Sequence, residues 1–74
     1  MMLPVIDPVA TGRRINELRT ENHLSVADIR EYLDFATTNA VYKWLKGESM
    51  PAIDNLLALS LLFHVSINEI LVYH

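Results

Sequence analysis

The sequence predicts a small all-α domain of five short helices with an extended N-terminal arm. Three observations support this prediction. Apolar residues recur at the spacing of a helix face along most of the chain, a motif typical of a helix end followed by a capped helix start occurs twice, and Gly47 and Pro51 bound a loop between helical segments. The chain has 74 residues, 51% of them hydrophobic, and no cysteine, so one domain must be stabilised by apolar burial without disulfides.

The N-terminal segment is expected to form the arm. Its two prolines are unfavourable inside a helix, and the apolar residues between them suit a short strand or a packing segment. Thr11 is a suitable N-cap for a first helix that ends at Asn22. We therefore divide the chain into an extended arm, residues 1–10, and a helical domain, residues 11–74.

A seven-residue motif occurs twice, as His23–Ile29 and as His64–Ile70. In each copy the His takes the position after a helix, where a left-handed backbone is common and His is better tolerated than most non-glycine residues. The Ser two residues later is a suitable N-cap, and the acid three residues after it completes a capping box. The motif therefore predicts two tight corners between helices.

The remaining elements follow from these corners. In the third helix, Val41 and Trp44 share one face and are expected to point into the core, and Gly47 ends the helix. The expected boundaries are 25–33 for the second helix, 34–36 for a turn, Thr37 or Thr38 to Lys46 for the third helix, Ile53–Phe63 for the fourth and Ser66 onward for a short fifth.

The order of these residues resembles the lambda-repressor-like helix-turn-helix family, of the Cro/CI or XRE type. The resemblance covers Gly12 to Leu71 and depends on the combination rather than on any one residue. It implies a five-helix bundle whose third helix lies in the major groove of DNA. The matching residues are Arg14-Ile15, Leu18-Arg19, Leu24-Ser25, Ile29, Leu33, Val41, Lys43-Trp44, Gly47, Pro51, Leu56 to Ser60, Val65-Ser66-Ile67 and Glu69-Ile70-Leu71.

The resemblance implies that the first turn of the third helix contacts bases. By position, Thr38 and Asn39 face the bases and Thr37 lies at the helix start. An Asn can pair with adenine through one donor and one acceptor, and a Thr offers a hydroxyl and a methyl group that suits thymine. The turn between Leu33 and Val41 is one residue longer than is usual in the family, so the residues that face the bases can be shifted by one position along the chain. Capping and turn chemistry is the alternative explanation for the three polar residues.

The resemblance also implies phosphate contacts. Tyr42 and Lys43 lie one turn further along the third helix, where they reach phosphate or the groove wall. Lys46, with Arg13 or Arg14 on the first helix, is expected to contact phosphates. All six cations belong to the first three predicted helices, so a local basic face is compatible with the net charge of −3. The alternative is that these cations only solubilise helix surfaces.

The C-terminal half contains more apolar residues than one small helical core can cover. Exposed apolar surface is typical of an interface. We therefore expect a two-fold homodimer through the fourth and fifth helices and the C-terminus, helped by the arm segment Leu3–Ile6. Such a dimer would bind a palindromic operator. The candidate interface residues are Leu61, Ile67, Val72 and Tyr73.

These expectations describe a cytoplasmic transcriptional regulator that binds double-stranded DNA and acts as a repressor by occupying an operator. No enzyme activity, small-molecule substrate or cofactor is expected, because nothing in the sequence places a nucleophile beside a base. No metal site is expected, because three His without Cys form no recognised ligand spacing. No membrane span is expected, because the densest apolar run, Leu56 to Phe63, is too short.

A different function on the same fold is a protein-interaction module or an antitoxin-type adaptor with weak or no DNA binding. The acidic net charge and the apolar C-terminal half favour it. Val26 favours it too, because the family usually has there a Gln that contacts phosphate. The two functions differ in whether the third helix is flanked by positive charge.

Overall fold

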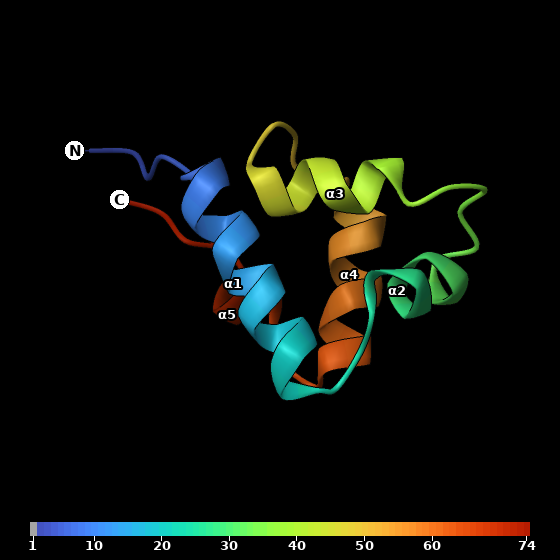
Figure 1. The fold of residues 1–74 in the computed structure, drawn as a ribbon. Coiled ribbons are helices and arrows are strands. Elements are labelled where there is room, and N and C mark those ends of the chain that lie inside the picture. Colours follow the sequence, from blue (N-terminus) through green and yellow to red (C-terminus); the bar gives the residue numbers. More distant parts are fainter. Residues whose placement is uncertain (1) are drawn as a thin grey trace.

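The structure, a computed structural model, describes residues 2–74 and confirms the all-α prediction. Within this range the helices are α1 (Pro8–Glu21), α2 (Val26–Tyr32), α3 (Asn39–Lys46), α4 (Ile53–Phe63) and α5 (Ile67–Ile70). Figure 1 shows α3 lying across one end of the molecule, with α1 at its side and α4 behind it. The predicted helix boundaries hold to within about one residue for α2, α3, α4 and α5.

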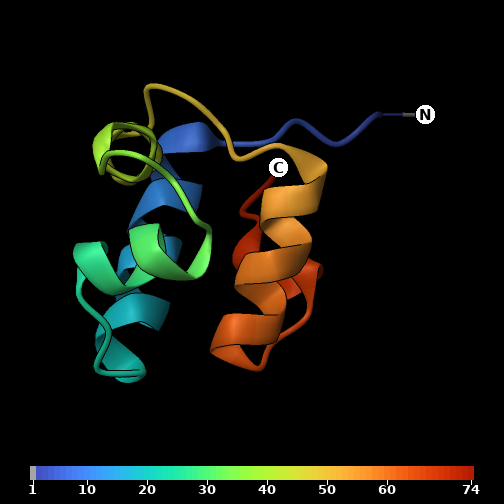
Figure 2. The ribbon, with the colours of Figure 1, turned by 90° about the vertical axis from the view of Figure 1, so that its right-hand side faces the viewer.

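The helices form two layers around one core. In Figure 2, α1, α2 and α3 lie on one side, and α4 and α5 lie on the other. Val41 and Trp44 are buried between the layers, as the sequence predicted. The core consists of Ile15 and Leu18 from α1, Ile29 from α2, Val41 and Trp44 from α3, Leu56, Leu59 and Phe63 from α4, and Ile70 from α5.

The start of α1 corrects the sequence analysis. The N-cap is Asp7, whose carboxylate accepts a hydrogen bond of 2.9 Å from the Ala10 N–H, and Pro8 occupies the first helical position. Proline is well suited to that position, since it lacks an N–H that would otherwise be unsatisfied. Thr11 was predicted as the N-cap, and that prediction is wrong. It lies inside the helix and is fully buried, and the extended arm therefore ends at Asp7.

Both copies of the repeated motif form the predicted corners. His23 and His64 adopt left-handed backbone angles, with φ of 57° and 58°. Ser25 and Ser66 each complete a capping box with the acid three residues later. The Ser25 N–H donates to the Asp28 carboxylate at 2.8 Å, and the Ser25 hydroxyl accepts from the Asp28 N–H at 3.0 Å. The Ser25 N–H, followed by the Ser25 side chain, lowers the pKa of the Asp28 carboxyl below its usual 3.8.

The arm pairs with the C-terminal end of the chain. Val5 and His74 exchange two backbone hydrogen bonds of 2.9 Å, and Ile6 forms an antiparallel bridge with Tyr73. The His74 ring lies 3.2 Å from the Asp7 carboxylate. The Ala10 N–H, followed by the His74 side chain, lowers the pKa of Asp7 below 3.8. Figure 1 accordingly shows the arm and the C-terminal segment on the same side of the molecule.

Two glycines bring α1 and α3 into close contact. A Cβ at Gly12 would overlap the carbonyl oxygen of Trp44 and lie 2.9 Å from that of Leu45. Gly47 ends α3 with φ of 76°, as predicted, and a Cβ there would lie 2.7 Å from the Cα of Val9. The absence of side chains at these two positions lets the C-terminal end of α3 rest directly on the first turns of α1.

Candidate nucleic-acid interface

One face of α3 is exposed along its whole length. Asn39, Tyr42, Lys43 and Lys46 all have exposed side chains, and Tyr42 keeps 48% of its surface accessible. These positions are spaced three or four residues apart and therefore share one side of the helix. The opposite side is the buried one. The exposed face contains amide, phenol and ammonium groups and no carboxylate.

The leading end of α3 is uncovered. Thr37 and Asn39 are exposed, and Thr38 is half-buried. Backbone geometry makes Thr38 the N-cap, but its side chain makes no capping hydrogen bond. The Thr37 hydroxyl accepts one from the Asn39 N–H instead, at 3.3 Å. Within residues 2–74, the Thr38 hydroxyl and the Asn39 side-chain amide therefore form no hydrogen bond, and both groups can bind a ligand.

The turn before α3 is fixed by contacts that the sequence analysis did not identify. Asp34 adopts a left-handed conformation with φ of 58°. The Arg30 guanidinium donates to the Phe35 carbonyl at 2.8 Å. The Phe35 ring packs edge-to-face on Trp44, with 5.8 Å between ring centroids. The longer turn is therefore anchored on both sides, and it holds the leading end of α3 in one position.

Half of the cations bind groups of the protein itself. A guanidinium that binds a carbonyl oxygen is held in one orientation, which reduces its reach toward an external ligand. The three bonds run from Arg14 to the Glu69 carbonyl at 2.9 Å, from Arg19 to that of Leu24 at 2.8 Å, and from Arg30 to that of Phe35 at 2.8 Å.

The other three cations are available to solvent. Arg13, Lys43 and Lys46 are exposed, and within residues 2–74 none of them forms an ion pair or a side-chain hydrogen bond. The ion pair in that range is Arg14–Glu17 at 3.4 Å, and the His74 ring lies 3.2 Å from the Asp7 carboxylate. No carboxylate in the described chain therefore forms an ion pair with the cations of α3.

Arg13 and Arg14 lie on different sides of α1. Successive helical residues are rotated by about 100°. Gly12 and Val9 face α3, and Arg13 projects to solvent beside Val9 on the helix circumference. Arg14 is turned toward α5, where it binds Glu69. Of the two predicted phosphate ligands, the structure brings Arg13 to the α3 side of the helix and places Arg14 on the side that holds α5.

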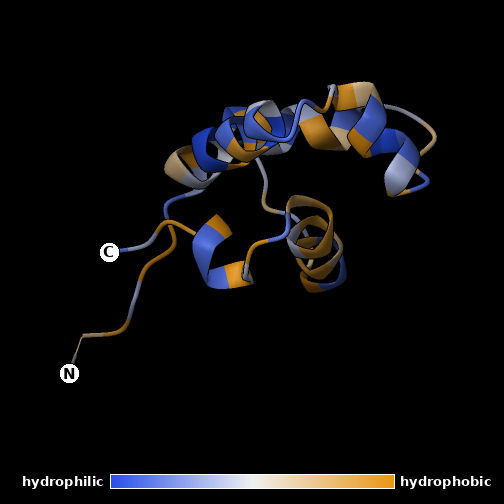
Figure 3. Ribbon diagram, turned by 90° about the horizontal axis from the view of Figure 1, so that it is seen from below, coloured by the Kyte–Doolittle hydropathy of each residue, from blue (hydrophilic) through white to orange (hydrophobic). Residues whose placement is uncertain are grey.

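The predicted dimer residues lie in the second layer. Leu61 and Tyr73 keep 62% and 54% of their surface exposed, and Ile67 and Val72 are half-buried. Leu57, one turn before Leu61 on α4, is 53% exposed. Figure 3 shows hydrophobic residues around most of the circumference of α4. The second layer thus presents apolar surface to solvent as well as to the core.

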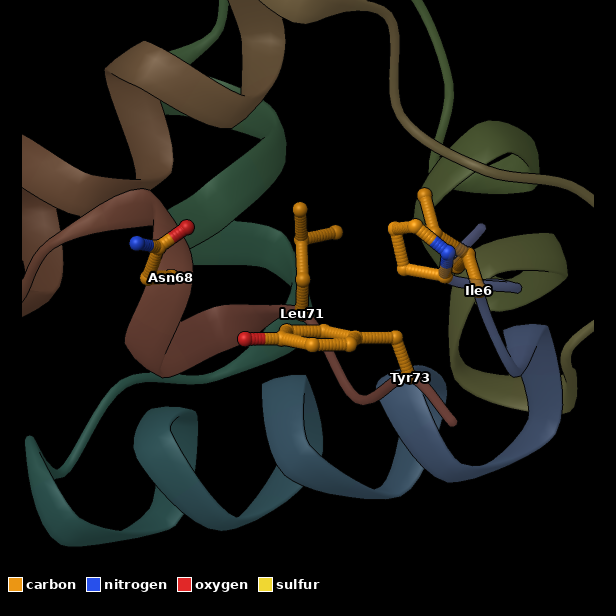
Figure 4. A pocket seen from close by; sticks show the side chains of 5 residues that line it. Ile6, Asn68, Leu71 and Tyr73 are labelled. Carbon is orange, nitrogen blue, oxygen red and sulfur yellow. The ribbon is translucent and has the colours of Figure 1, made fainter. Parts of the chain in front are cut away.

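A shallow pocket adjoins this surface. It has a volume of about 320 Å³ and lies where the arm meets α5 and the C-terminal segment. Figure 4 shows the Tyr73 ring lying along Leu71, between Asn68 and Ile6. The lining is mainly apolar, and its residues are Pro4, Ile6, Asn68, Leu71 and Tyr73.

No helix in residues 2–74 has the length and apolar character needed to span a membrane. The same residues contain no group of three or more potential metal ligands.

Comparisons with known proteins agree with this geometry. A helix-turn-helix family model matches residues 15–70. The restriction-modification controller protein C.AhdI from Aeromonas hydrophila is structurally similar, with a TM-score of 0.76 and 25% sequence identity over 86% of this chain and 96% of that one. The DNA-binding domain of BldD shares the fold, with a TM-score of 0.73 and 19% identity over 89% of this chain and 94% of that one. No curated protein sequence matches the chain.

Proposed function

Because this chain belongs to the helix-turn-helix family of DNA-binding transcription regulators, we propose that it binds a specific duplex sequence and represses transcription by occupying an operator. α3 enters the major groove with its leading end toward the bases. The protein acts in the cytoplasm, and neither a cofactor nor a small-molecule substrate takes part.

The observation that supports this proposal most strongly is the exposed face of α3. The leading end of α3 is uncovered. Lys43 and Lys46 lie further along the same exposed face and form no ion pair with a carboxylate in residues 2–74. A groove-binding helix needs both properties, since bases must be reached and phosphate charge must be compensated. The acidic total lowers the expected affinity for DNA, and the two free cations on this face supply positive charge where the phosphates would lie.

We assign separate roles to the residues on this face. Asn39 and Thr38 contact base edges, since their amide and hydroxyl groups are free. Tyr42 contacts the groove wall, with Thr37 holding the helix start. Lys43 and Lys46 contact phosphates.

The phosphate contact from α1 is assigned to Arg13 rather than Arg14. Arg13 is exposed on the α3 side of α1, whereas the Arg14 guanidinium donates to the Glu69 carbonyl at 2.9 Å.

We also propose that the protein is a homodimer and that its operator is palindromic. Leu61, Ile67, Val72 and Tyr73 form the interface in the second layer, together with the arm. Two-fold symmetry would present two copies of α3 about 34–36 Å apart, one helical turn of DNA. The similar C.AhdI is a controller protein of a restriction-modification system, and a role as a regulator fits that likeness.

The base-contacting role is tested by comparing Asn39→Ala with Lys43→Ala. Asn39→Ala is expected to weaken binding to the selected operator by about 1–3 kcal/mol and to leave random DNA unaffected. Lys43→Ala is expected to weaken binding to both DNAs equally, because a phosphate contact is independent of sequence. Fluorescence anisotropy on an operator selected from random duplexes measures both. Equal losses on both DNAs for Asn39→Ala would remove it from the base-contacting set.

The dimer is tested by Leu61→Glu, which places a charge in the proposed interface. We expect the wild type to sediment as a dimer and the variant as an 8.5 kDa monomer. Tyr32→Glu is the matched control, since Tyr32 is 49% exposed but belongs to α2, in the other layer. A monomeric wild type at high micromolar concentration would contradict the dimer.

A protein-interaction module is the second candidate function. The half-buried Val26 at the start of α2 and the exposed apolar residues of α4 favour it. If selection from random duplexes enriches no sequence and binding to all DNA is weak, this candidate replaces the first.

A further inference from the structure

We propose that α1 is the rigid connection between the dimer interface and the DNA-binding helix, and that Thr11 and Arg14 are the positioning residues that fix this connection. They would thereby set the spacing between operator half-sites that the dimer accepts. The inference rests on the proposed function, and it assigns Arg14 a role other than the phosphate contact expected from the sequence.

One side of α1 is fixed to α3 by backbone contact. The carbonyl oxygens of Trp44 and Leu45 lie against Gly12, and the backbone of Val9 lies against Gly47. Packed backbones leave no side-chain rotamers that could absorb movement. α1 and the C-terminal end of α3 therefore move as one body.

A different side of α1 is fixed to α5 and the C-terminal segment by hydrogen bonds. The Thr11 hydroxyl accepts from the Val72 N–H at 3.0 Å and lies 3.4 Å from the Val72 carbonyl oxygen. The Arg14 Nε donates to the Glu69 carbonyl at 2.9 Å. Thr11 is fully buried, so water does not compete for its hydroxyl.

These bonds provide directional contact between the two layers. The N-cap of α1 and the arm also reach the C-terminal segment through the backbone, since the Asp7 N–H donates to the Val72 carbonyl at 2.8 Å and Val5 exchanges two bonds with His74. Thr11 and Arg14 add the side-chain hydrogen bonds, whereas the apolar burial of the core favours contact without specifying direction. The segment that Thr11 holds includes Val72, followed by Tyr73, both in the proposed interface. Loosening it would let the interface tilt relative to α3 without unfolding the core.

The consequence concerns operator geometry. A symmetric dimer binds both half-sites only if its two α3 helices match their separation and rotational phase. When geometry forbids simultaneous contact, the gain from two linked sites is lost. The stiffness of the α1 connection therefore determines how sharply the dimer discriminates between half-site spacings.

The first experiment needs no DNA. The chain has no cysteine, so Glu48→Cys, on an exposed residue just after α3, gives one spin-label site per protomer. We expect a narrow distance distribution between the two labels in the dimer. Thr11→Val, which keeps the shape but removes the hydroxyl, should broaden it, and Thr11→Ser, which keeps the hydroxyl, should restore it. An equally narrow distribution for Thr11→Val would overturn the inference.

Arg14→Met and Arg13→Met form a matched pair on neighbouring residues. Arg14→Met should broaden the label distances and leave the salt dependence of DNA binding unchanged. Arg13→Met should leave the distances narrow and reduce the salt dependence. The reverse pattern would assign Arg14 to phosphate and overturn its positioning role. Trp44 fluorescence verifies that each variant is folded, since that residue is the only tryptophan and is buried.

The second experiment measures binding to operators whose half-sites are moved apart. For the wild type, an insertion of about 5 base pairs, half a turn of DNA, should lower affinity on the order of a hundredfold. Thr11→Val and Arg14→Met should make the affinity depend less on spacing and should weaken binding at the best spacing. A variant that only loses stability would lower the affinity by the same factor at every spacing. Such a uniform loss would overturn the inference.

The two proposals fail in different ways. A dimer that shows the expected label distances but binds no operator would contradict the DNA-binding function and leave the α1 connection standing. A dimer that binds its operator with unchanged distances in Thr11→Val would contradict the connection alone. A monomeric wild type would contradict the connection together with the dimer.

Discussion

Gly12 determines how closely α1 approaches α3. Glycine inside a helix normally destabilises it by roughly 0.5–1 kcal/mol relative to alanine, so an exposed Gly→Ala change would be stabilising. Here the neighbouring atoms are the backbone carbonyls of Trp44 and Leu45, which cannot rotate away. The glycine is therefore required by the packing of two helices and not by its own backbone angles.

Gly12→Ala is expected to destabilise the protein by about 1–3 kcal/mol, as overpacking of a core contact does. The direction of the change in unfolding free energy distinguishes the two effects, because helix propensity alone would make the Ala variant more stable than the wild type. Urea denaturation followed by Trp44 fluorescence gives the free energy of unfolding. A variant as stable as the wild type would show that α1 and α3 are able to separate at little cost.

At the scale of the element, the capping boxes determine where α2 and α5 begin. α5 has four residues, too few for a stable helix by propensity alone, and it depends on its Ser66 cap and the burial of Ile70. α2 has seven residues, and its cap links Ser25 to Asp28 in both directions. Both helices are therefore stabilised by local hydrogen bonds at their N-termini.

Asp28→Asn is expected to lower stability at neutral pH and to reduce its pH dependence. The pKa of Asp28 lies below 3.8 in the folded protein, so its carboxylate stabilises the fold above that pH, and this contribution is lost as pH falls through the lowered pKa. Unfolding curves from pH 7 to pH 2 should converge for the two proteins at the acid end. Parallel curves over the whole range would contradict the assignment.

At the scale of the whole molecule, the distribution of charge matters more than its sum. The net charge is −3, yet the exposed cations without a partner in residues 2–74 are Arg13 on α1 and Lys43 and Lys46 on α3. In physiological salt the field of a charge is largely screened beyond a Debye length of about 8 Å, so the charges nearest a phosphate weigh most in its binding. The three cations define the expected electrostatic footprint.

Operator binding should depend on salt as expected for these three cations in each protomer. If each contacts one phosphate, the logarithm of the association constant falls with the logarithm of salt concentration with a slope of about −5 for the dimer. Lys43→Ala should reduce the slope by about 2, since it removes one contact from each protomer. A slope near −10 would require the remaining cations to bind phosphate as well, and their contacts to backbone carbonyls would then have to break.

The sequence by itself determined where the helices lie. Ser25, Ser66, His64 and Gly47 act on backbone groups a few residues away, so their effect is visible in a short stretch of chain. The wrong prediction at Thr11 also concerns a local signal. Asp7 followed by Pro8 is a suitable helix start, but the prediction excluded Pro8 from the helix because proline is unfavourable in a helix interior. The exposed face of α3 was predictable too, because helical spacing separates Asn39 and Lys43 from the core.

Only the tertiary structure decided which cations are free and what connects the layers. Arg13 and Arg14 are identical neighbours in the sequence, and they differ because the partner of Arg14 lies 55 residues further along the chain. The partner of Thr11 is 61 residues away. Folding brings such partners together through the packing of the whole core, so no local pattern records them. The residues proposed to orient α3 became visible only in three dimensions.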